Sequence, residues 1–192
     1  LLEDRLRGKR VLELGGGRTG LAGLVLAMDT NASTILLTDG HPVAVENQRV
    51  CLALNRALLR VRDVSSARLL WEEDDKSGTV RDLMEAQKGL RFDLILGADL
   101  LFFEKFPELS AAMDQLLAPQ GRVVLCQPSR GGTMEKFLED SAVAARFDAE
   151  LLPEDADKSI FAMHKEFAED EKYDPALHFP RFIVLKRKGE GV

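Results

Sequence analysis

A glutamate beside a run of glycines is the first feature of this chain with a clear chemical use. Glu13 precedes Gly15, Gly16 and Gly17, where the apolar run of residues 10–14 ends and a helical pattern begins near residue 20. A strand, a glycine turn and a helix in this order form the nucleotide-binding element of open α/β sheets. Glycine suits the turn because its backbone adopts positive φ and lets a ligand approach closely.

The carboxylate of Glu13 indicates which kind of ligand the turn would accept. It would repel a pyrophosphate, but it would attract an ammonium group. S-adenosylmethionine carries an ammonium, a sulfonium and no phosphate, so the turn favours this methyl donor. Two alternatives stay open. Residues 15–20 also match the dinucleotide pattern G-x-G-x-x-G, and the glycines can form a purely structural turn.

Two further residues are candidates for binding the rest of a nucleoside. Asp39 ends the apolar run 34–38, where its carboxylate could accept hydrogen bonds from both ribose hydroxyls; alternatively it caps a helix that begins near Pro42. Trp71 is the only tryptophan, and we expect it to end the third strand. Its indole could stack on an adenine, or it could be a large core residue.

A second acid marks a candidate acceptor site. Asp99 comes two residues after the apolar run 92–97, and Phe102 and Phe103 come shortly after it. A carboxylate there could hold a target ammonium or help it to lose a proton, and the two rings could form an apolar wall. The alternative is a solvated loop acid. Arg130, after the next apolar run, could line a substrate rim or belong to a flexible surface loop.

Other chemistries lack their signatures. The three histidines, at positions 41, 164 and 178, have neither the spacing nor the cysteine partners of a zinc site, so we expect no metal. A G-x-S-x-G elbow and a P-loop are both absent, which disfavours acyl transfer and P-loop phosphate chemistry.

The elements that must position these residues alternate along the chain. Apolar runs predict strands at about 10–14, 34–38, 67–71, 92–97, 121–126, 146–152 and 179–187, with helical patterns at 42–50 and 107–118 among the segments between them. Short apolar runs are typical of strands buried on both faces of a parallel sheet. We therefore expect one domain over 1–192: a Rossmann-like, doubly wound, mostly parallel sheet of seven strands.

An acidic insert separates the last two predicted strands. Residues 153–178 contain eight acidic residues and three lysines, and Ile160, Met163 and Phe167 form an amphipathic stripe. Two interpretations are open: a helix packed on the sheet with a solvated acidic face, or a substrate-docking element.

Composition limits the partners. A net charge of −6 argues against a general nucleic-acid binder. A membrane span would need a run of about 18 apolar residues, and the sequence contains none. Cys51 and Cys126 lie in apolar patterns and predict buried thiols in a reducing compartment, the cytoplasm and also the nucleus. We also expect a monomer, and a further N-terminal segment, because the sequence begins with Leu1 rather than Met.

Taken in order, these motifs resemble the seven-β-strand methyltransferases that modify protein lysines. The resemblance rests on Glu13 to Gly17, the Leu-Thr-Asp-Gly run that ends at Gly40, Leu-Leu-Trp at 69–71, and Asp99-Leu-Leu-Phe102. The last of these matches that group's Asp-x-x-Phe/Tyr signature. Softer matches, among them Arg130-Gly131 and residues 177–180, make the chain most similar to the members that methylate calmodulin. The resemblance covers nearly the whole chain from Arg10 onward.

The resemblance implies a function and a site. The function is trimethylation of a lysine of calmodulin, with S-adenosylmethionine as donor and S-adenosylhomocysteine as product. Asp99 and Phe102 would form the acceptor channel. The donor would be held by Glu13, Gly15, Gly16 and Gly17 at its methionine part, Asp39 at the ribose and Trp71 at the adenine, with Gly40 and Ala98 beside them.

Two observations depart from that pattern. No Trp-Pro element of the kind that members carry near the donor site is present, and calmodulin is itself acidic, so docking would need a local basic face. Candidate cations are Arg122, Arg130, Lys136, Arg181 and residues 186–188. Alternative functions are methylation of another protein lysine (on a chaperone or an elongation factor), a nicotinamide-dependent oxidoreductase, and a donor-binding module without catalysis.

Overall fold

A seven-stranded mixed sheet organises the chain, in a computed structural model that describes residues 5–71 and 78–189. The strand order is β3-β2-β1-β4-β5-β7-β6, and β7 runs antiparallel to the other six strands. The strands are β1 (Arg10–Leu14), β2 (Thr34–Asp39), β3 (Asp63–Arg68), β4 (Phe92–Ala98), β5 (Leu117–Gln127), β6 (Phe147–Leu151) and β7 (Arg181–Arg187). The predicted doubly wound architecture is confirmed.

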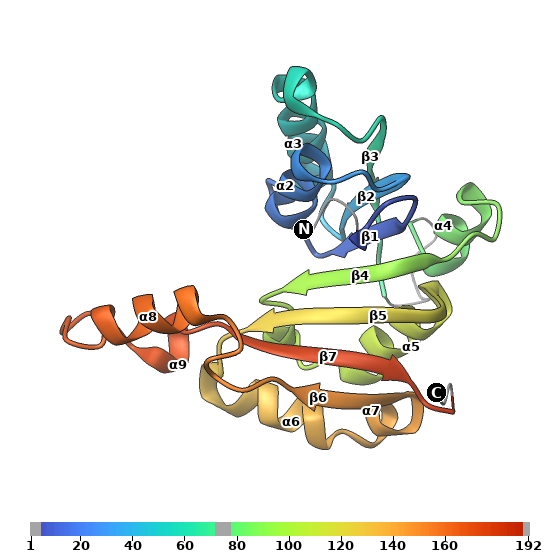
Figure 1. Cartoon of the computed structure of the whole chain (residues 1–192). Helices are drawn as coiled ribbons and strands as arrows, with labels where there is room; N and C mark the ends of the chain where they lie inside the picture. The colour runs from blue at the N-terminus through green and yellow to red at the C-terminus, as the bar shows by residue number, and fades with distance from the viewer. Residues whose placement is uncertain (1–4, 72–77, 190–192) are drawn as a thin grey trace.

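Helices cover both faces of this sheet (Figure 1). On one face, α2 (Leu21–Asp29) and α3 (Pro42–Leu54) pack against β1, β2 and β3. On the other face lie α4 (Val80–Ala86), α5 (Phe106–Leu116), α6 (Thr133–Glu139) and α7 (Ser141–Arg146). The remaining helices are α8 (Lys158–Phe167), α9 (Pro175–His178) and the 3₁₀ turns η1 (Arg56–Leu58), η2 (Leu101–Phe103) and η3 (Arg130–Gly132).

Alternation along the strands divides the core into two clusters, one on each face. In β1, Val11 packs with Ile35 and Leu37 beneath α2, whereas Leu12 and Leu14 point into the larger cluster on the opposite face. Successive side chains of a strand point to opposite faces, so a strand covered on both sides must be apolar throughout. This explains why β1, β2 and β4 read as continuous apolar runs.

Local signals at the helix ends agree with the fold. Pro42 occupies the first turn of α3, and the His41 side chain caps that helix by accepting the Val43 N–H at 3.2 Å. At α4, Thr79 and Asp82 form a reciprocal capping box.

The third strand was predicted wrongly. The apolar run at 67–71 indicated a strand there, but β3 spans Asp63–Arg68. As the edge strand beside β2, it pairs on one side only, and its polar sequence tolerates partial exposure. Leu69 instead leaves the sheet and is buried in the core, so Trp71 lies three residues beyond the strand rather than at its end.

The acidic insert forms two helices, α8 and α9, between β6 and β7. Figure 1 shows both helices beyond the ends of β4 and β5, away from the sheet faces. In the predicted stripe, Met163 and Phe167 are 53% and 45% exposed. The insert is therefore helical as predicted, but the interpretation of its stripe as a helix face packed on the sheet is wrong.

Candidate functional site at the carboxyl ends of the strands

The glycine turn lies at the point where the strand order reverses. Strand β1 pairs with β2 on one side and β4 on the other, so the chain leaves the sheet in opposite directions on either side of β1. In open α/β sheets, ligands bind outside the carboxyl ends of the strands at such a point. Gly15, Asp39 and Asp99 follow or end β1, β2 and β4, and the topology therefore brings them to one edge.

Positive φ explains two of the three glycines. Gly15 and Gly17 have φ of 56° and 61°. A Cβ on Gly15 would collide with the Leu100 side chain, whereas a Cβ on Gly17 would meet nothing within 4 Å. Gly17 therefore leaves open space beside bare backbone, as a ligand-binding turn requires.

Gly16 is needed for packing. A Cβ there would lie 3.0 Å from the Glu13 carboxyl carbon and 3.0 Å from Gly20 Cα. Its N–H donates to the Thr38 carbonyl at 2.8 Å, and the Thr38 hydroxyl donates to the Glu13 carbonyl at 2.7 Å. These bonds fasten the turn to the end of β2.

Asp39 also holds the turn. One carboxylate oxygen accepts the Gly17 N–H at 2.9 Å, and the other accepts the His41 N–H at 2.8 Å. Each carboxylate oxygen has a second lone pair, so these contacts leave acceptor capacity for a ligand. The helix cap itself is His41, so the alternative function predicted for Asp39, capping α3 directly, is wrong. Gly40 follows Asp39, and its carbonyl accepts Arg68 Nε at 3.1 Å.

A buried glutamine that the sequence analysis did not single out supports the turn from below. Gln48, on α3, is fully buried; its Nε2 donates to the Gly17 carbonyl at 2.8 Å and its Oε1 accepts the Ser66 hydroxyl at 2.6 Å. The only sign of this role in the sequence is that a polar residue occupies a helix position that packs toward the sheet.

Glu13 is buried beneath α2, with 4% of its surface exposed. Its carboxylate accepts the Gly23 N–H at 2.8 Å. Burial raises the pKa of Glu13, and hydrogen bonds from the Gly23 and Ala22 backbone oppose that shift. A buried carboxylate of this kind provides a favourable place for an ammonium group.

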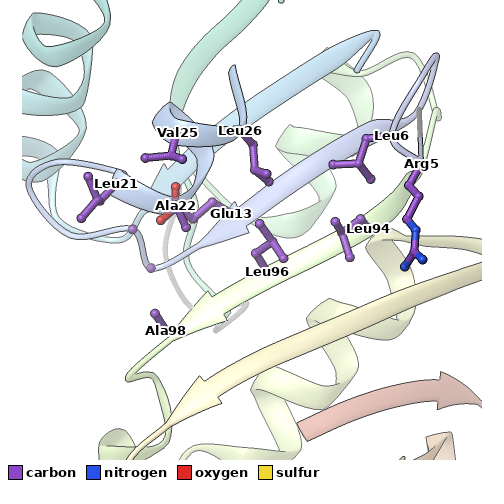
Figure 2. Close-up of a pocket in the computed structure, with 12 residues that line it drawn as sticks. Arg5, Leu6, Glu13, Leu21, Ala22, Val25, Leu26, Leu94, Leu96 and Ala98 are labelled. Atoms are coloured by element: carbon purple, nitrogen blue, oxygen red, sulfur yellow. The ribbon is translucent and has the colours of Figure 1, made fainter. Parts of the chain in front are cut away.

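A cavity of ≈ 660 Å³ opens beside Glu13, between α2 and the face of β4 (Figure 2). Glu13, Gly15, Gly16 and Ala98 line its end at the carboxyl edge of the sheet. Its other walls are mainly apolar: Leu21, Ala22, Val25 and Leu26 come from α2 and Leu94 and Leu96 from β4, with Leu6 and Arg5 at the far end. The polar end therefore fits the charged part of a ligand, and the rest of the cavity is a hydrophobic surface.

The predicted acceptor residues form a second group at the same edge. Asp99 has φ of 53°, and its N–H donates to the Cys126 carbonyl at 3.0 Å. Gln127, also not singled out before, accepts the N–H groups of Leu100 and Leu101 on one side-chain oxygen at 3.0 and 3.3 Å. Backbone and side-chain bonds thus fix the start of η2.

Aromatic rings adjoin Asp99. Phe102 and Phe103 are 47% and 56% exposed, and their ring centroids lie 4.1 Å apart. Trp71 packs edge-on against Phe103 at 6.1 Å and also contacts the large core cluster. The structure therefore joins Trp71 to the acceptor aromatics and to the core; its predicted stacking on adenine stays a prediction.

An ion pair occupies the carboxylate of Asp99. The Arg130 guanidinium lies 2.9 Å from Asp99 Oδ2, and the two side chains are 42% and 43% exposed. This pair holds Arg130 beside Asp99, and its predicted place at a substrate rim stays a prediction. Among residues 5–71 and 78–189, no group of three potential metal-ligating side chains occurs, and no helix is long and apolar enough to cross a membrane.

Solved structures share this fold. The chain superposes on a predicted O-methyltransferase from Agrobacterium tumefaciens with a TM-score of 0.63 and 17% identity, over 95% of this chain and 76% of the other. A ribosomal protein L11 methylase from Lactobacillus delbrueckii subsp. bulgaricus gives a TM-score of 0.59 and 17% identity, over 95% and 72% of the two chains. The fold is that of a methyltransferase domain.

Sequence comparisons identify the family. Residues 2–142 match the model of the lysine methyltransferase family, and the chain belongs to that family. It is 28% identical to the calmodulin-lysine N-methyltransferase of Arabidopsis thaliana, over 95% of this chain and 58% of that protein. It is 33% identical to protein N-lysine methyltransferase METTL21A of Danio rerio, over 81% and 65% of the two chains.

The chain thus spans about three fifths of the length of these curated relatives. Membership of the family favours the methyl-donor interpretation of the glycine turn over the dinucleotide one. It agrees with the resemblance seen in the Glu13–Gly17 and Asp99–Phe102 motifs.

Proposed function

We propose that this protein transfers methyl groups from S-adenosylmethionine to a lysine side chain of another protein. The observation that carries the proposal is the juxtaposition of two groups at one sheet edge. A glycine turn with a buried carboxylate lies at the end of β1, and an acid with exposed aromatic rings follows β4. Family membership supports the same reaction.

The donor fits the first group. Glu13 lies at the polar end of the cavity and would attract the donor ammonium, while Gly17 exposes bare backbone beside it. Asp39 would accept hydrogen bonds from the ribose hydroxyls with the lone pairs that Gly17 and His41 leave free. When bound, the donor supplies a methyl group activated by its sulfonium, so that the protein contributes mainly placement and exclusion of water.

The second group would prepare the acceptor. A lysine must lose its proton before it can attack, and an apolar surrounding lowers the pKa of an amine by desolvation. Phe102 and Phe103 provide such a surface next to Asp99. Asp99 would orient the arriving ammonium through charge.

For the acceptor protein, we propose calmodulin, supported by the Arabidopsis thaliana relative and by the motifs at Asp99 and Arg130. Charge makes this a demanding substrate, since several candidate cations are already paired: Arg130 with Asp99, Lys136 with Glu104, Arg181 with Glu154 and Arg187 with Asp114. A mouse relative named EEF1A lysine methyltransferase 3, 31% identical over 84% of this chain and 65% of that protein, favours an elongation factor as second candidate.

Intact-mass analysis tests the proposal. The protein and S-adenosylmethionine are incubated in three separate reactions, each with one unmodified acceptor: calmodulin, elongation factor 1A or a chaperone. Methyl-sized mass increments on one of them, lost with the Asp99→Asn variant, are the expected result. Donor binding by calorimetry without an increment on any of the three would instead favour a donor-binding module, and reduction of a nicotinamide would favour the oxidoreductase.

A further inference from the structure

Asp99, Gln127 and Arg130 lie together in one corner, and two buried N–H groups among them have no hydrogen-bond acceptor. Arg130 makes an ion pair with Asp99, but its Nε is buried without a hydrogen-bond partner. The Nε2 of Gln127 is buried and unpartnered in the same way, although its Oε1 holds η2. The corner is therefore built to hold Asp99 in place while leaving Arg130 incompletely bonded.

Asp99 and Arg130 are held in the fold in different ways. Asp99 is anchored by its N–H and by the two bonds that Gln127 accepts from η2. Arg130 has φ of 36° and is followed by Gly131 and Gly132 at 66° and 82°, so three successive residues have left-handed backbone. Arg130 thus lies on a glycine-rich turn between β5 and α6, outside the strands of the sheet.

We propose that Arg130 sets the protonation state of the target lysine by neutralising Asp99. This proposal rests on the proposed function. Alone, Asp99 would stabilise the lysine as an ammonium, which cannot attack a methyl group. A guanidinium already paired with Asp99 cancels part of that attraction and disfavours a second cation beside it, so that the lysine arrives as an ammonium but loses its proton at the site and reacts as the neutral amine.

The proton balance follows from this arrangement. The lysine ammonium gives its proton to solvent as it leaves water for the apolar surface of Phe102. The neutral nitrogen then forms the new bond to the methyl carbon as the sulfonium–carbon bond breaks. The product regains a positive charge in the methylated ammonium, which Asp99 can pair with once Arg130 shifts on its turn. Arg130 is thus a positioning residue that acts through Asp99.

The surroundings offer an internal probe and a matched control. Cys126, on β5, has its pKa raised by burial and, secondarily, by the negative charge of Asp99. Lys136, on α6, carries the same charge as Arg130 and pairs with Glu104, the residue after η2, at 2.8 Å. On η3, α6 and α9, which pack here, the charged or titratable side chains besides Arg130 are Glu135, Lys136, Glu139 and His178; Glu104 follows η2, and Cys126 lies near the end of β5.

Arg130→Met and Lys136→Met are compared, with Arg130→Lys as the conservative variant. If Arg130 neutralises Asp99, Arg130→Met raises the pH at which Cys126 is alkylated by iodoacetamide, with the rate at Cys51 as an internal reference. Lys136→Met leaves that pH unchanged, and Arg130→Lys restores it in part. An unchanged Cys126 profile in Arg130→Met overturns the proposal, whether or not an acceptor protein is known.

Kinetics test whether Arg130 controls the protonation of the target lysine, with the acceptor protein that the mass analysis identifies. In Arg130→Met, the rising limb of kcat against pH should move up by about one pH unit. Below that limb, kcat and the KM for the acceptor should both fall, because the ammonium binds an unpaired Asp99 more tightly. A structural defect would instead raise KM at every pH and overturn the proposal. Failure of the wild type to methylate any acceptor would refute the proposed function, a result distinct from either outcome.

Discussion

Asp39 accepts the Gly17 N–H on Oδ2 at 2.9 Å, and this bond joins the end of β2 to the glycine turn after β1. The residue proposed to bind the ribose is therefore also the residue that holds the methionine-binding turn. Its other oxygen accepts the His41 N–H, so one carboxylate orients both the turn and the start of α3. Donor binding and local order should depend on it together.

Replacing Asp39 with alanine should weaken donor binding by about 1–3 kcal/mol, because two backbone N–H groups and the ribose hydroxyls lose their acceptor. Titration calorimetry with S-adenosylmethionine measures this loss. Asp63→Ala is the matched control: Asp63 accepts the Thr34 hydroxyl at 2.8 Å at the opposite end of the neighbouring strand. Asp63→Ala should lower stability but leave donor affinity unchanged; equal affinities in the two variants would remove Asp39 from the site.

Gly17→Ala should separate backbone strain from loss of ligand space. Gly17 and Gly89 both have positive φ, 61° and 74°, and a Cβ at either meets nothing within 4 Å. Each alanine variant should therefore lose about 1–2 kcal/mol of stability, measured by denaturant unfolding. Only Gly17→Ala should also lose donor affinity, since its methyl group enters the space proposed for the donor. Wild-type affinity in Gly17→Ala would show that the donor does not approach this backbone.

Most strands could be predicted because each is buried on two faces and reads as an apolar run. The glycine turn could be predicted for a related reason, since only glycine fits Gly15 against Leu100. The edge strand β3 could not, because partial exposure permits its Asp-Val-Ser-Ser sequence, and the more apolar residues after it enter the core. The hydrophobic pattern therefore located the buried residues that follow β3, but not the residues of β3 that pair with β2.

The site could be predicted only in part. Asp39 and Asp99 follow apolar runs, and parallel topology alone brings such positions together. Gln48 and Gln127 escaped notice because their roles depend on contacts with residues 31 and 27 positions away along the chain. The Asp99–Arg130 pair likewise depends on how η2 and η3 meet in space, which no local pattern encodes.

Glu13→Gln should weaken donor binding, and its effect on stability should depend on pH. Burial raises the folded-state pKa of Glu13 above its ordinary value of 4.5, so the folded protein binds this proton more tightly than the unfolded chain does. The stability that Glu13 contributes is therefore complete below pH 4.5 and is lost as pH rises through the folded-state pKa. Glutamine avoids that loss and can still accept the Gly23 N–H.

Thermal unfolding should therefore show Glu13→Gln to be as stable as the wild type or more stable at pH 7, with the difference vanishing toward pH 4. Calorimetry at pH 7 should show about tenfold weaker binding of S-adenosylmethionine, because the ammonium loses its counter-charge. Glu46→Gln is the control, since Glu46 is exposed and pairs only with Arg49 on the described part of α3. Tighter donor binding in Glu13→Gln would contradict the proposed contact.

Asp99→Asn should reduce turnover far more than donor affinity. Asparagine tolerates the left-handed backbone at this position, where φ is 53°, so the fold of η2 is kept while the charge is removed. We expect kcat to fall about 100-fold, the effect of a poorly positioned acceptor, with donor affinity within about twofold of the wild type. Single-turnover methylation and donor calorimetry on the same sample measure both. Asp99→Ala adds backbone strain and should also lower the unfolding midpoint. If Asp99→Asn mainly weakened donor binding, Asp99 would belong to the donor site rather than to the acceptor site.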